Sequence, residues 1–340
     1  MLNWLNTVSR VFGLEIVRAN EIRKLREATE LFLHPSASRS ELPEDAAAYL
    51  DLQNPRLQEL RERYRRHSNP AMLHSLWSDE HVESQLDLRY FRGDNVYVWQ
   101  HRKLTTAAHY LLAARHLQEI DHLDLLNKLS EDDLFGAYTF RLDDDRVVSR
   151  DLLDSVAEIH FLVDELGLEG LAGSRILDIG AGYGRLAHRL STALPEVEAV
   201  LCVDAVAEST FLSEYYLRFR GVDDRAPVVP FDEIEDRLAT ERVEVAVNIH
   251  SFSECTESAV AWWLDLLGRH RVPYLMIVPN PGDHGGTKLL TREGDGRHLD
   301  FAPTVESAGY RLRTRRPKYQ APSVQAHGVF PSYYYLFELA

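Results

Sequence analysis

The chain has 340 residues, enough for two domains of average size, and its hydrophobic content of 45% is ordinary for a globular protein. No run of 18 apolar residues occurs, and residues 1–6 lack the basic start and apolar stretch of a secretory signal, which predicts a cytoplasmic protein without a membrane partner. The net charge of −15 repels phosphate backbones and predicts that nucleic acid is not a partner. The same acidity could simply maintain solubility, so it favours a cationic ligand only weakly.

Residues 1–148 are predicted to form a mainly helical region. Apolar residues recur at three- and four-residue spacing, with charges between them, over 21–32, 57–66 and 105–117. A short hairpin is expected near the end of this region, because residues 138–148 carry alternate apolar residues on both sides of a run of three aspartates. The helical region could form a dimer interface or close over a bound acceptor, and both interpretations stay open.

Residues 149–340 are predicted to form an α/β domain. Ser149 is placed to cap a helix that has Asp151 in its first turn and runs to Leu166. Strands then alternate with helices, which indicates a parallel sheet covered by helices. The expected strands are 175–179, 200–203, 227–229, 243–249, 274–278, 310–314 and 332–339. The last two follow one another without room for a crossover helix, so the final strand should run antiparallel.

A glycine-rich turn joins the first of these strands to the next helix. Its alternate glycines Gly180, Gly182 and Gly184 let the backbone bend sharply and approach a ligand, and the following helix N-terminus offers unpaired N–H groups. The second strand ends at Asp204, about 20 residues after the last glycine, the spacing at which an acid accepts ribose hydroxyls. The third glycine comes one residue earlier than in the dinucleotide fingerprint, with Arg185 in its place, so a pyrophosphate ligand is disfavoured.

The motif Asp178-x-Gly-x-Gly-x-Gly resembles the first motif of class I S-adenosylmethionine-dependent methyltransferases, and the strand pattern resembles their seven-stranded, Rossmann-like sheet. The resemblance implies S-adenosylmethionine as the cofactor, with glycines along its methionine part and the strand-end acid on its ribose. The residues assigned to the cofactor on this basis are Asp178, Gly180, Ala181, Gly182, Gly184, Asp204, Ala205, Asn248, His250 and Ser251.

Ligands of an open parallel sheet bind beyond the carboxyl ends of its strands, so the loops there are candidates for chemistry. After the fourth strand, His250 could act as a base or be a neutral histidine at the sheet rim. Glu254 could contact the acceptor or cap the next helix. After the fifth strand, Asp283 and His284 could accept a proton, and His284 is the leading base. His327, which enters the last strand at the same face, is a second candidate base.

Both His284 and His327 could instead be solvated loop histidines without a catalytic role. Residues 285–300, which include Gly294 and Gly296, are expected to form a lid over the acceptor.

Three segments, 90–99, 148–155 and 248–254, resemble a group of bacterial sugar O-methyltransferases, and this resemblance runs from about residue 85 to the C-terminus. It implies methyl transfer to a hydroxyl or amino group of a sugar unit in a bacterial natural product. The acidity of the chain favours an amino sugar of the aminoglycoside kind, as in antibiotic biosynthesis. The residues assigned to the acceptor are Asp151, Glu254, Tyr90 and Trp99.

Some sugar methyltransferases with this fold hold a divalent ion at the acceptor. No paired acids follow the fifth strand here, so no metal is predicted.

Two other functions stay open. Tyr90, Phe91 and Trp99 could line a flat pocket for a phenolic or polyketide acceptor. The chain could also be a non-catalytic scaffold with a cofactor-binding fold. The intact glycine turn and Asp204 argue against the scaffold, because a chain released from cofactor binding has no physical need of either.

Overall fold

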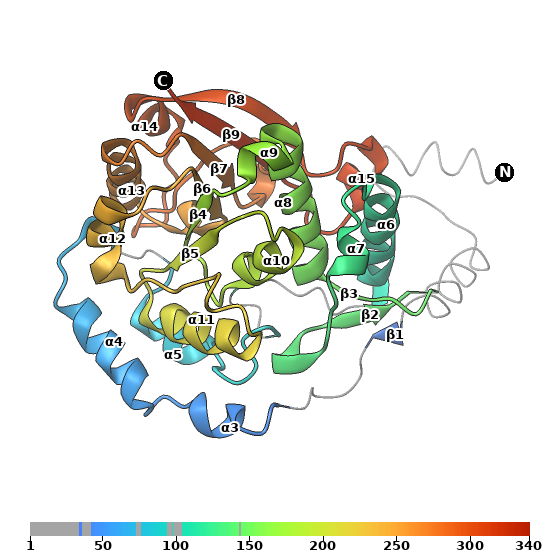
Figure 1. Ribbon diagram of the computed structural model, residues 1–340, viewed down its shortest axis with the longest axis horizontal. Coiled ribbons are helices and arrows are strands. Elements are labelled where there is room, and N and C mark those ends of the chain that lie inside the picture. Colours follow the sequence, from blue (N-terminus) through green and yellow to red (C-terminus); the bar gives the residue numbers. More distant parts are fainter. Residues whose placement is uncertain (1–33, 36–41, 73–75, 94–96, 98–103, 143) are drawn as a thin grey trace.

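The computed structural model describes residues 34–35, 42–72, 76–93, 97, 104–142 and 144–340 (Figure 1). The helix predicted over 21–32, together with Trp99, lies outside this part of the chain. Within it, the main sheet has six strands in the order β5-β4-β6-β7-β9-β8. Their bounds are β4 (Arg175–Ile179), β5 (Ala199–Val203), β6 (Val245–Ile249), β7 (Tyr274–Val278), β8 (Tyr310–Pro317) and β9 (Tyr333–Leu339).

The direction of the strands confirms the predicted α/β fold. β4 pairs in parallel with β5 and β6, and β6 pairs in parallel with β7. β9 runs antiparallel to both of its neighbours, β7 and β8. This order, with an antiparallel strand inserted near one edge, is the class I methyltransferase fold. The connection into β9 also holds a short helix, α15 (Pro322–His327), which the sequence did not predict.

The third predicted strand, 227–229, is reduced to an isolated parallel bridge between Val228 and Cys202 of β5. The Cys202 N–H donates to the Pro227 carbonyl over 2.9 Å, and the Val229 N–H donates to the Cys202 carbonyl over 2.8 Å. Pro227 and Pro230 lack the N–H groups that a longer ladder would use. The segment therefore occupies the edge position beside β5 without forming a full strand.

Helices cover the sheet on both sides. Figure 1 shows α8 (Arg150–Leu166) and α10 (Arg185–Ala193) on one side and α12 (Ile234–Thr240), α13 (Glu257–Arg269) and α14 (Ala302–Ser307) on the other. The domain also contains α9 (Leu168–Leu171), α11 (Ala207–Phe219), η3 (Phe231–Glu233), η4 (Ser251–Glu254) and η5 (Gly282–His284). The Ser149 side chain accepts from the Leu152 N–H, as predicted for the cap of α8. Thr256, not Glu254, caps α13.

The region before α8 is mainly helical, as predicted. Its elements are β1 (His34–Pro35), α3 (Ala46–Tyr49), α4 (Pro55–Arg65), η1 (Pro70–Met72), α5 (Asp79–Gln85), α6 (Leu104–Ile120), α7 (Leu125–Lys128), η2 (Leu134–Gly136), β2 (Thr139–Arg141) and β3 (Val147–Ser149). β2 and β3 form the predicted hairpin, and β1 pairs with β2.

This region packs directly on the sheet domain. α4 lies along α11, where Arg56 forms an ion pair with Glu214 and Arg61 forms one with Glu208, both over 2.6 Å. The Tyr64 hydroxyl lies 2.8 Å from that of Thr210 and accepts from the Phe231 N–H. Buried apolar residues form one continuous core across both regions, so a division at residue 148 stays a prediction. Among the described residues, no helix is both long and apolar enough to span a membrane.

Candidate cofactor and acceptor site

The glycine turn lies between β4 and α10, and its glycines have different neighbours. Gly180, Gly182 and Gly184 have φ angles of +72°, +58° and +85°, a region that glycine adopts without strain. A Cβ on Gly180 would lie 2.4 Å from the Ser251 Oγ. A Cβ on Gly184 would lie 2.9 Å from the Ser213 Oγ, on α11. Gly180 and Gly182 therefore face the site, whereas Gly184, which was also assigned to the cofactor, serves packing.

Asp204 holds the turn from the end of β5. Its carboxylate accepts the N–H of Gly182 over 3.0 Å and the N–H of Val206 over 2.9 Å. One acid thus fixes both the glycine turn and the start of α11. Burial raises the pKa of Asp204 to about 7 despite these hydrogen bonds. Burial also raises the pKa of the neighbouring Asp178 to about 7.

A cavity opens in front of these two acids, at the carboxyl ends of the parallel strands. Its lining includes most of the residues assigned to the cofactor, namely Asp178, Gly180, Ala181, Gly182, Asp204, Ala205, His250 and Ser251. Asn248 is fully buried instead. Its amide donates to the Ile179 carbonyl over 3.0 Å and accepts from the Phe252 N–H over 2.9 Å, so it braces the ends of β4 and β6.

Two aromatic residues from the helical region cover the cavity. The Tyr97 ring would lie 2.9 Å from a Cβ on Gly182, and it packs against Trp77 with ring centroids 5.1 Å apart. The Trp77 indole N–H donates to Glu254 over 2.7 Å. The free volume of the cavity is about 100 Å³, below the roughly 300–1,000 Å³ of typical ligand pockets, so the cavity has to widen for a nucleoside-sized ligand to enter.

His250 lines the cavity in a strained conformation. Its φ is +67°, which is uncommon for a residue with a side chain and is often found at functional sites. Burial lowers the pKa of His250 to about 3, with Arg150 adding to the effect, so its imidazole is neutral at pH 7. Glu254 also lines the cavity and is bound by Trp77 and by the Asn280 amide at 3.1 Å. Burial raises the pKa of Glu254.

Buried charges form the far wall of the cavity. Arg150 and Asp154 line it from the first turns of α8, with 3.0 Å between the Arg150 Nε and an Asp154 oxygen. The Lys318 ammonium binds the other Asp154 oxygen over 2.5 Å. Arg185 lines the cavity as well and binds Glu158 through two hydrogen bonds.

A second cavity of about 380 Å³ lies behind this wall. The Arg150 guanidinium lies 3.5 Å from the centroid of the Phe330 ring, and Phe330 lines the second cavity. The other lining residues are His109, Tyr110, Pro281, Gly282, Gly285, Ala326, Gly328, Val329 and Pro331. The loop after β7 and the connection into β9 therefore meet here, as the sequence predicted.

Two of the histidines proposed as bases, His284 and His327, lie beside the second cavity without lining it, whereas His250 lines the first. The His284 Nε2 would lie 3.4 Å from a Cβ on Gly282, and its Nδ1 is buried without a hydrogen-bond partner among the described residues. Burial lowers the pKa of His284, which leaves a neutral base at pH 7. Asp283 and His327 are exposed and belong to neither lining, although the His327 carbonyl contacts the His109 imidazole. The expected lid, 285–300, is partly packed, since Leu289 and Thr291 are buried.

Two of the residues assigned to the acceptor lie elsewhere. Asp151 is buried against Arg92 and accepts from the Tyr183 hydroxyl, so it holds Tyr183, which lies within the glycine turn between Gly182 and Gly184. Tyr90 is half-buried beside Gly136 and lines neither cavity, and Phe91 packs in the core against Phe135. Sequence reasoning missed Trp77, Arg150 and Asp154. The spacing of Arg150 and Asp154, four residues apart behind a helix cap, was the available signal.

We expect Gly180→Ala to abolish measurable binding of S-adenosylhomocysteine at concentrations that saturate the wild type. The new methyl would sit 2.4 Å from the Ser251 side chain, and the positive φ adds strain. Calorimetry checks this. Gly167→Ala is the matched control, because Gly167 has a φ of +76° with open space around it. Equal binding in both variants would show that the turn does not approach the ligand.

Asp204→Ala should weaken binding of S-adenosylhomocysteine by about 10- to 150-fold, the equivalent of roughly 1.5–3 kcal/mol for a lost hydrogen bond to a charged group. The exposed acid Asp224, changed to alanine, serves as the control. Unchanged affinity in Asp204→Ala would contradict the assignment of Asp204 to the ribose of the cofactor.

Binding of S-adenosylhomocysteine should strengthen between pH 6 and pH 8, by at most about tenfold per pH unit for each proton released. The pKa values of Asp178 and Asp204 are raised to about 7, and their ionised forms are the better acceptors for hydroxyl and ammonium groups. The stability of the ligand-free protein should change in the opposite direction, falling as the pH rises. A raised acid pKa stabilises the fold below the ordinary value of 3.8, and this contribution is lost as the pH rises through 7. Calorimetry and thermal unfolding across this range test both signs.

Comparison with known proteins agrees with the fold. No family model matches the chain. Ribosomal RNA small subunit methyltransferase G of Polaromonas naphthalenivorans is 28% identical over 138 residues, 39% of this chain and 62% of that protein. The protein of the same name from Ectopseudomonas mendocina is 28% identical over 171 residues, 46% of this chain and 73% of its own length. The chain thus spans less than two thirds of the first of these relatives.

Solved structures with similar folds include an S-adenosylmethionine-dependent methyltransferase from Clostridium acetobutylicum. It has 14% identity and a TM-score of 0.38, over 55% of this chain and 90% of that one. Magnesium protoporphyrin IX methyltransferase from Synechocystis, with bound S-adenosylmethionine, has 12% identity and a TM-score of 0.39, over 56% of this chain and 83% of that one. These scores are too low to inform function, and the strand order itself identifies the fold.

Proposed function

We propose that this protein is an S-adenosylmethionine-dependent methyltransferase. The observation that carries the proposal is the cavity at the carboxyl ends of β4 and β5, where Gly180 leaves no room for a side chain and Asp204 fixes the turn. Asp204 would hold the ribose hydroxyls, and Asp178 would lie along the cofactor's methionine part. When bound, the cofactor supplies an electrophilic methyl group on a sulfonium centre.

The acceptor would enter through the second cavity. Methyl transfer needs the acceptor atom in line with the methyl carbon, so the protein's task is to position the acceptor and remove its proton. Arg150 and Phe330 stand between the two cavities, so this pair would have to move apart for an acceptor atom to reach the methyl group. A sugar hydroxyl would pass its proton to His284 as its oxygen bonds to the methyl carbon and the bond from that carbon to the sulfonium sulfur breaks, with S-adenosylhomocysteine as the leaving group. An amine must first lose its own proton.

A sugar bearing amino groups is the acceptor we favour. The chain carries a net charge of −15, and Glu254 and Asp283 lie near the two cavities. Such charges attract a cationic acceptor and repel a polyphosphate. Of the three residues proposed for a phenolic slot, Tyr90 and Phe91 line neither cavity, and Trp99 lies outside the described residues.

Methylation of RNA is the second candidate. It rests on the names of the two relatives, which call both of them ribosomal RNA methyltransferases. Those matches cover 39% and 46% of this chain. The names of these two relatives weigh against the sequence-based prediction that nucleic acid is not a partner.

One assay separates these candidates. The full chain is supplied with S-adenosylmethionine and, in parallel reactions, an aminoglycoside panel, neutral sugars, simple phenols or small ribosomal subunits, and release of S-adenosylhomocysteine is measured. Turnover that depends on an amino sugar is the expected result. Turnover with ribosomal subunits alone would replace the sugar proposal with RNA methylation, and cofactor binding without turnover on any acceptor would favour a scaffold protein.

A further inference from the structure

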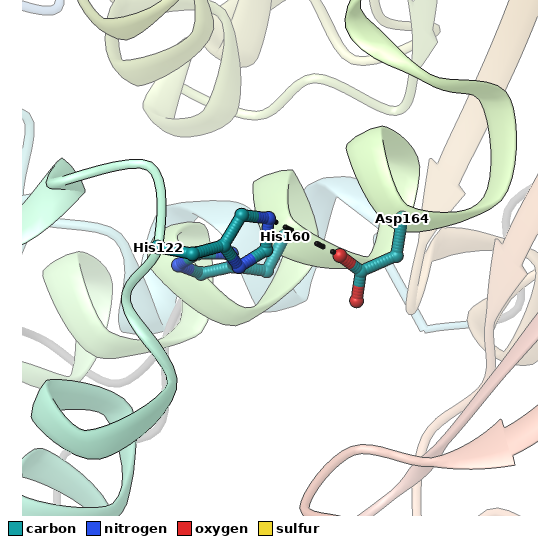
Figure 2. Close-up of side chains that lie close together, drawn as sticks. All are labelled: His122, His160 and Asp164. Atoms are coloured by element: carbon teal, nitrogen blue, oxygen red, sulfur yellow. Dashed lines mark ion pairs between the residues drawn. The ribbon is translucent and has the colours of Figure 1, made fainter.

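Two histidines and an aspartate lie together near the C-terminal half of α8, away from the end of the helix that lines the cofactor cavity. His160 and Asp164 are one helical turn apart on α8, and His122 comes from the connection between α6 and α7. One potential ligand atom from each residue lies within 4.8 Å of the other two. Figure 2 shows the two imidazoles beside each other, with the dashed line joining His122 to Asp164. Asp154, at the cavity, is six residues from His160, or about 9 Å along the helix.

The hydrogen bonds of the histidines leave one nitrogen of each ring available. The His160 Nε2 lies 2.9 Å from an Asp121 carboxylate oxygen, to which its N–H donates. The His160 Nδ1 then carries a lone pair, and it is buried without a hydrogen-bond partner among the described residues. The His122 Nδ1 lies 3.2 Å from the Ile120 carbonyl, which leaves the Nε2 as the lone-pair nitrogen, 3.6 Å from Asp164.

This pattern is the one that metal-binding histidines show. A ligating imidazole donates its second N–H to a carboxylate or a backbone carbonyl, which fixes the tautomer and the orientation of the ring. Asp121 takes that role for His160 and is itself held by the N–H groups of Leu125 and Leu126, each over 2.8 Å. A buried nitrogen without a partner is costly, so a ligand at the His160 Nδ1 would satisfy it.

From this geometry we propose that His122, His160 and Asp164 bind a divalent transition-metal ion of the zinc class. Two imidazole nitrogens and one carboxylate oxygen suit Zn²⁺ and exclude Mg²⁺ and Ca²⁺, which prefer oxygen ligands. In a tetrahedral zinc site the ligand atoms lie about 3.4 Å apart, so the separations within the cluster, all within 4.8 Å, must shorten by at most about 1.4 Å. His122 and Asp164 are exposed and can make this movement, whereas His160 is fixed in the helix packing.

Charges around the cluster favour a cation. Asp121, Asp164 and Glu165 are acidic residues in or beside it. Two arginines oppose them: Arg316 lies 2.7 Å from one Asp164 oxygen and 3.5 Å from Glu165, and Arg313 donates to the Glu165 carbonyl over 3.2 Å. Arg316 leaves the second Asp164 oxygen facing His122. The metal would tie the α6–α7 connection to α8. It is separate from the acceptor region, for which the sequence predicted no metal, and it does not depend on the proposed function.

The test uses the full chain without a polyhistidine tag, stripped with a chelator and titrated with ZnCl₂ in a calorimeter. We expect one Zn²⁺ per chain, and a loss of affinity of at least about tenfold in His122→Ala and in Asp164→Asn. His67→Ala, at another exposed histidine, should bind as the wild type does. Asp121→Asn should weaken binding by about 10- to 100-fold through the orientation of His160.

Two further readouts keep the outcome clear. Zn²⁺ should raise the midpoint of thermal unfolding in the wild type and not in His122→Ala, whose midpoint without metal should match the wild type because His122 is exposed. Bound Co²⁺ should give the visible absorption of a tetrahedral site. No Zn²⁺ binding by the wild type, or equal binding by His122→Ala and Asp164→Asn, would overturn the proposal and leave His122 and Asp164 as a surface ion pair.

Discussion

Replacing His284 by alanine is expected to lower kcat by about 10²- to 10⁴-fold on a hydroxyl acceptor, while the affinity for S-adenosylhomocysteine stays unchanged. His284 lies against Gly282, which lines the second cavity, and it lines no part of the cofactor cavity. Its pKa is lowered by burial, so the ring is free to take a proton at neutral pH. Kinetics under saturating S-adenosylmethionine, with cofactor binding measured in parallel, separate a chemical role from a structural one.

His270→Ala is the control for this variant, because His270 ends α13 and lines neither cavity. The activity of His284→Ala should also rise more steeply with pH than that of the wild type, since hydroxide would then replace the missing base. Full activity would instead move the base to His250 or His327. A smaller loss on amino acceptors than on hydroxyl acceptors would fit the weaker need of an amine for a base.

Replacing Arg92 by leucine is expected to destabilise the protein by about 3–5 kcal/mol, the usual cost of removing one partner from a buried ion pair. Arg92 is 1% exposed and binds Glu131 over 2.6 Å, Asp132 over 2.9 Å and Asp151 over 3.2 Å. Leucine fills part of the volume but removes the guanidinium that lies 3.2 Å from Asp151. Because Asp151 also holds Tyr183, the loss should loosen the glycine turn and weaken cofactor binding.

Urea unfolding followed by circular dichroism measures this change. Arg89→Leu is the matched control, since Arg89 is exposed and lies 3.8 Å from Asp51, a surface pair worth under about 1 kcal/mol. Similar stability losses in both variants would show that the buried ion pairs of Arg92 contribute no more to stability than a surface pair does.

Much of the fold could be predicted because it depends on local patterns. β4 and β7 have the predicted bounds, since apolar residues predominate in both and polar or turn-forming residues flank them. The glycine turn and Asp204 were predicted as one site from their spacing in the sequence, and the structure brings them into one cavity. The short helix α15 was missed because its six residues lie below the length at which periodicity is informative.

The site was harder to predict where it depends on distant pairs. Asp151 was expected to contact the acceptor, but its partner Arg92 is 59 residues away, and no local signal links them. Trp77 and Tyr97 line the cofactor cavity from the helical region, and their role could not be predicted because they too are distant in sequence from the glycine turn. Gly184 shares the motif spacing of its neighbours, yet only the packing of α11 against the turn shows that it faces Leu217. The roles of the catalytic and acceptor residues therefore stay predictions.

The central claim is that the cavity between the glycine turn and Asp204 binds S-adenosylmethionine. The most direct test is calorimetric titration of the wild-type chain with S-adenosylhomocysteine, beside Asp204→Ala and Asp224→Ala. We predict one binding site per chain in the wild type and in Asp224→Ala, with affinity reduced about 10- to 150-fold in Asp204→Ala. Absence of binding by the wild-type chain, or equal binding by all three, would contradict this account.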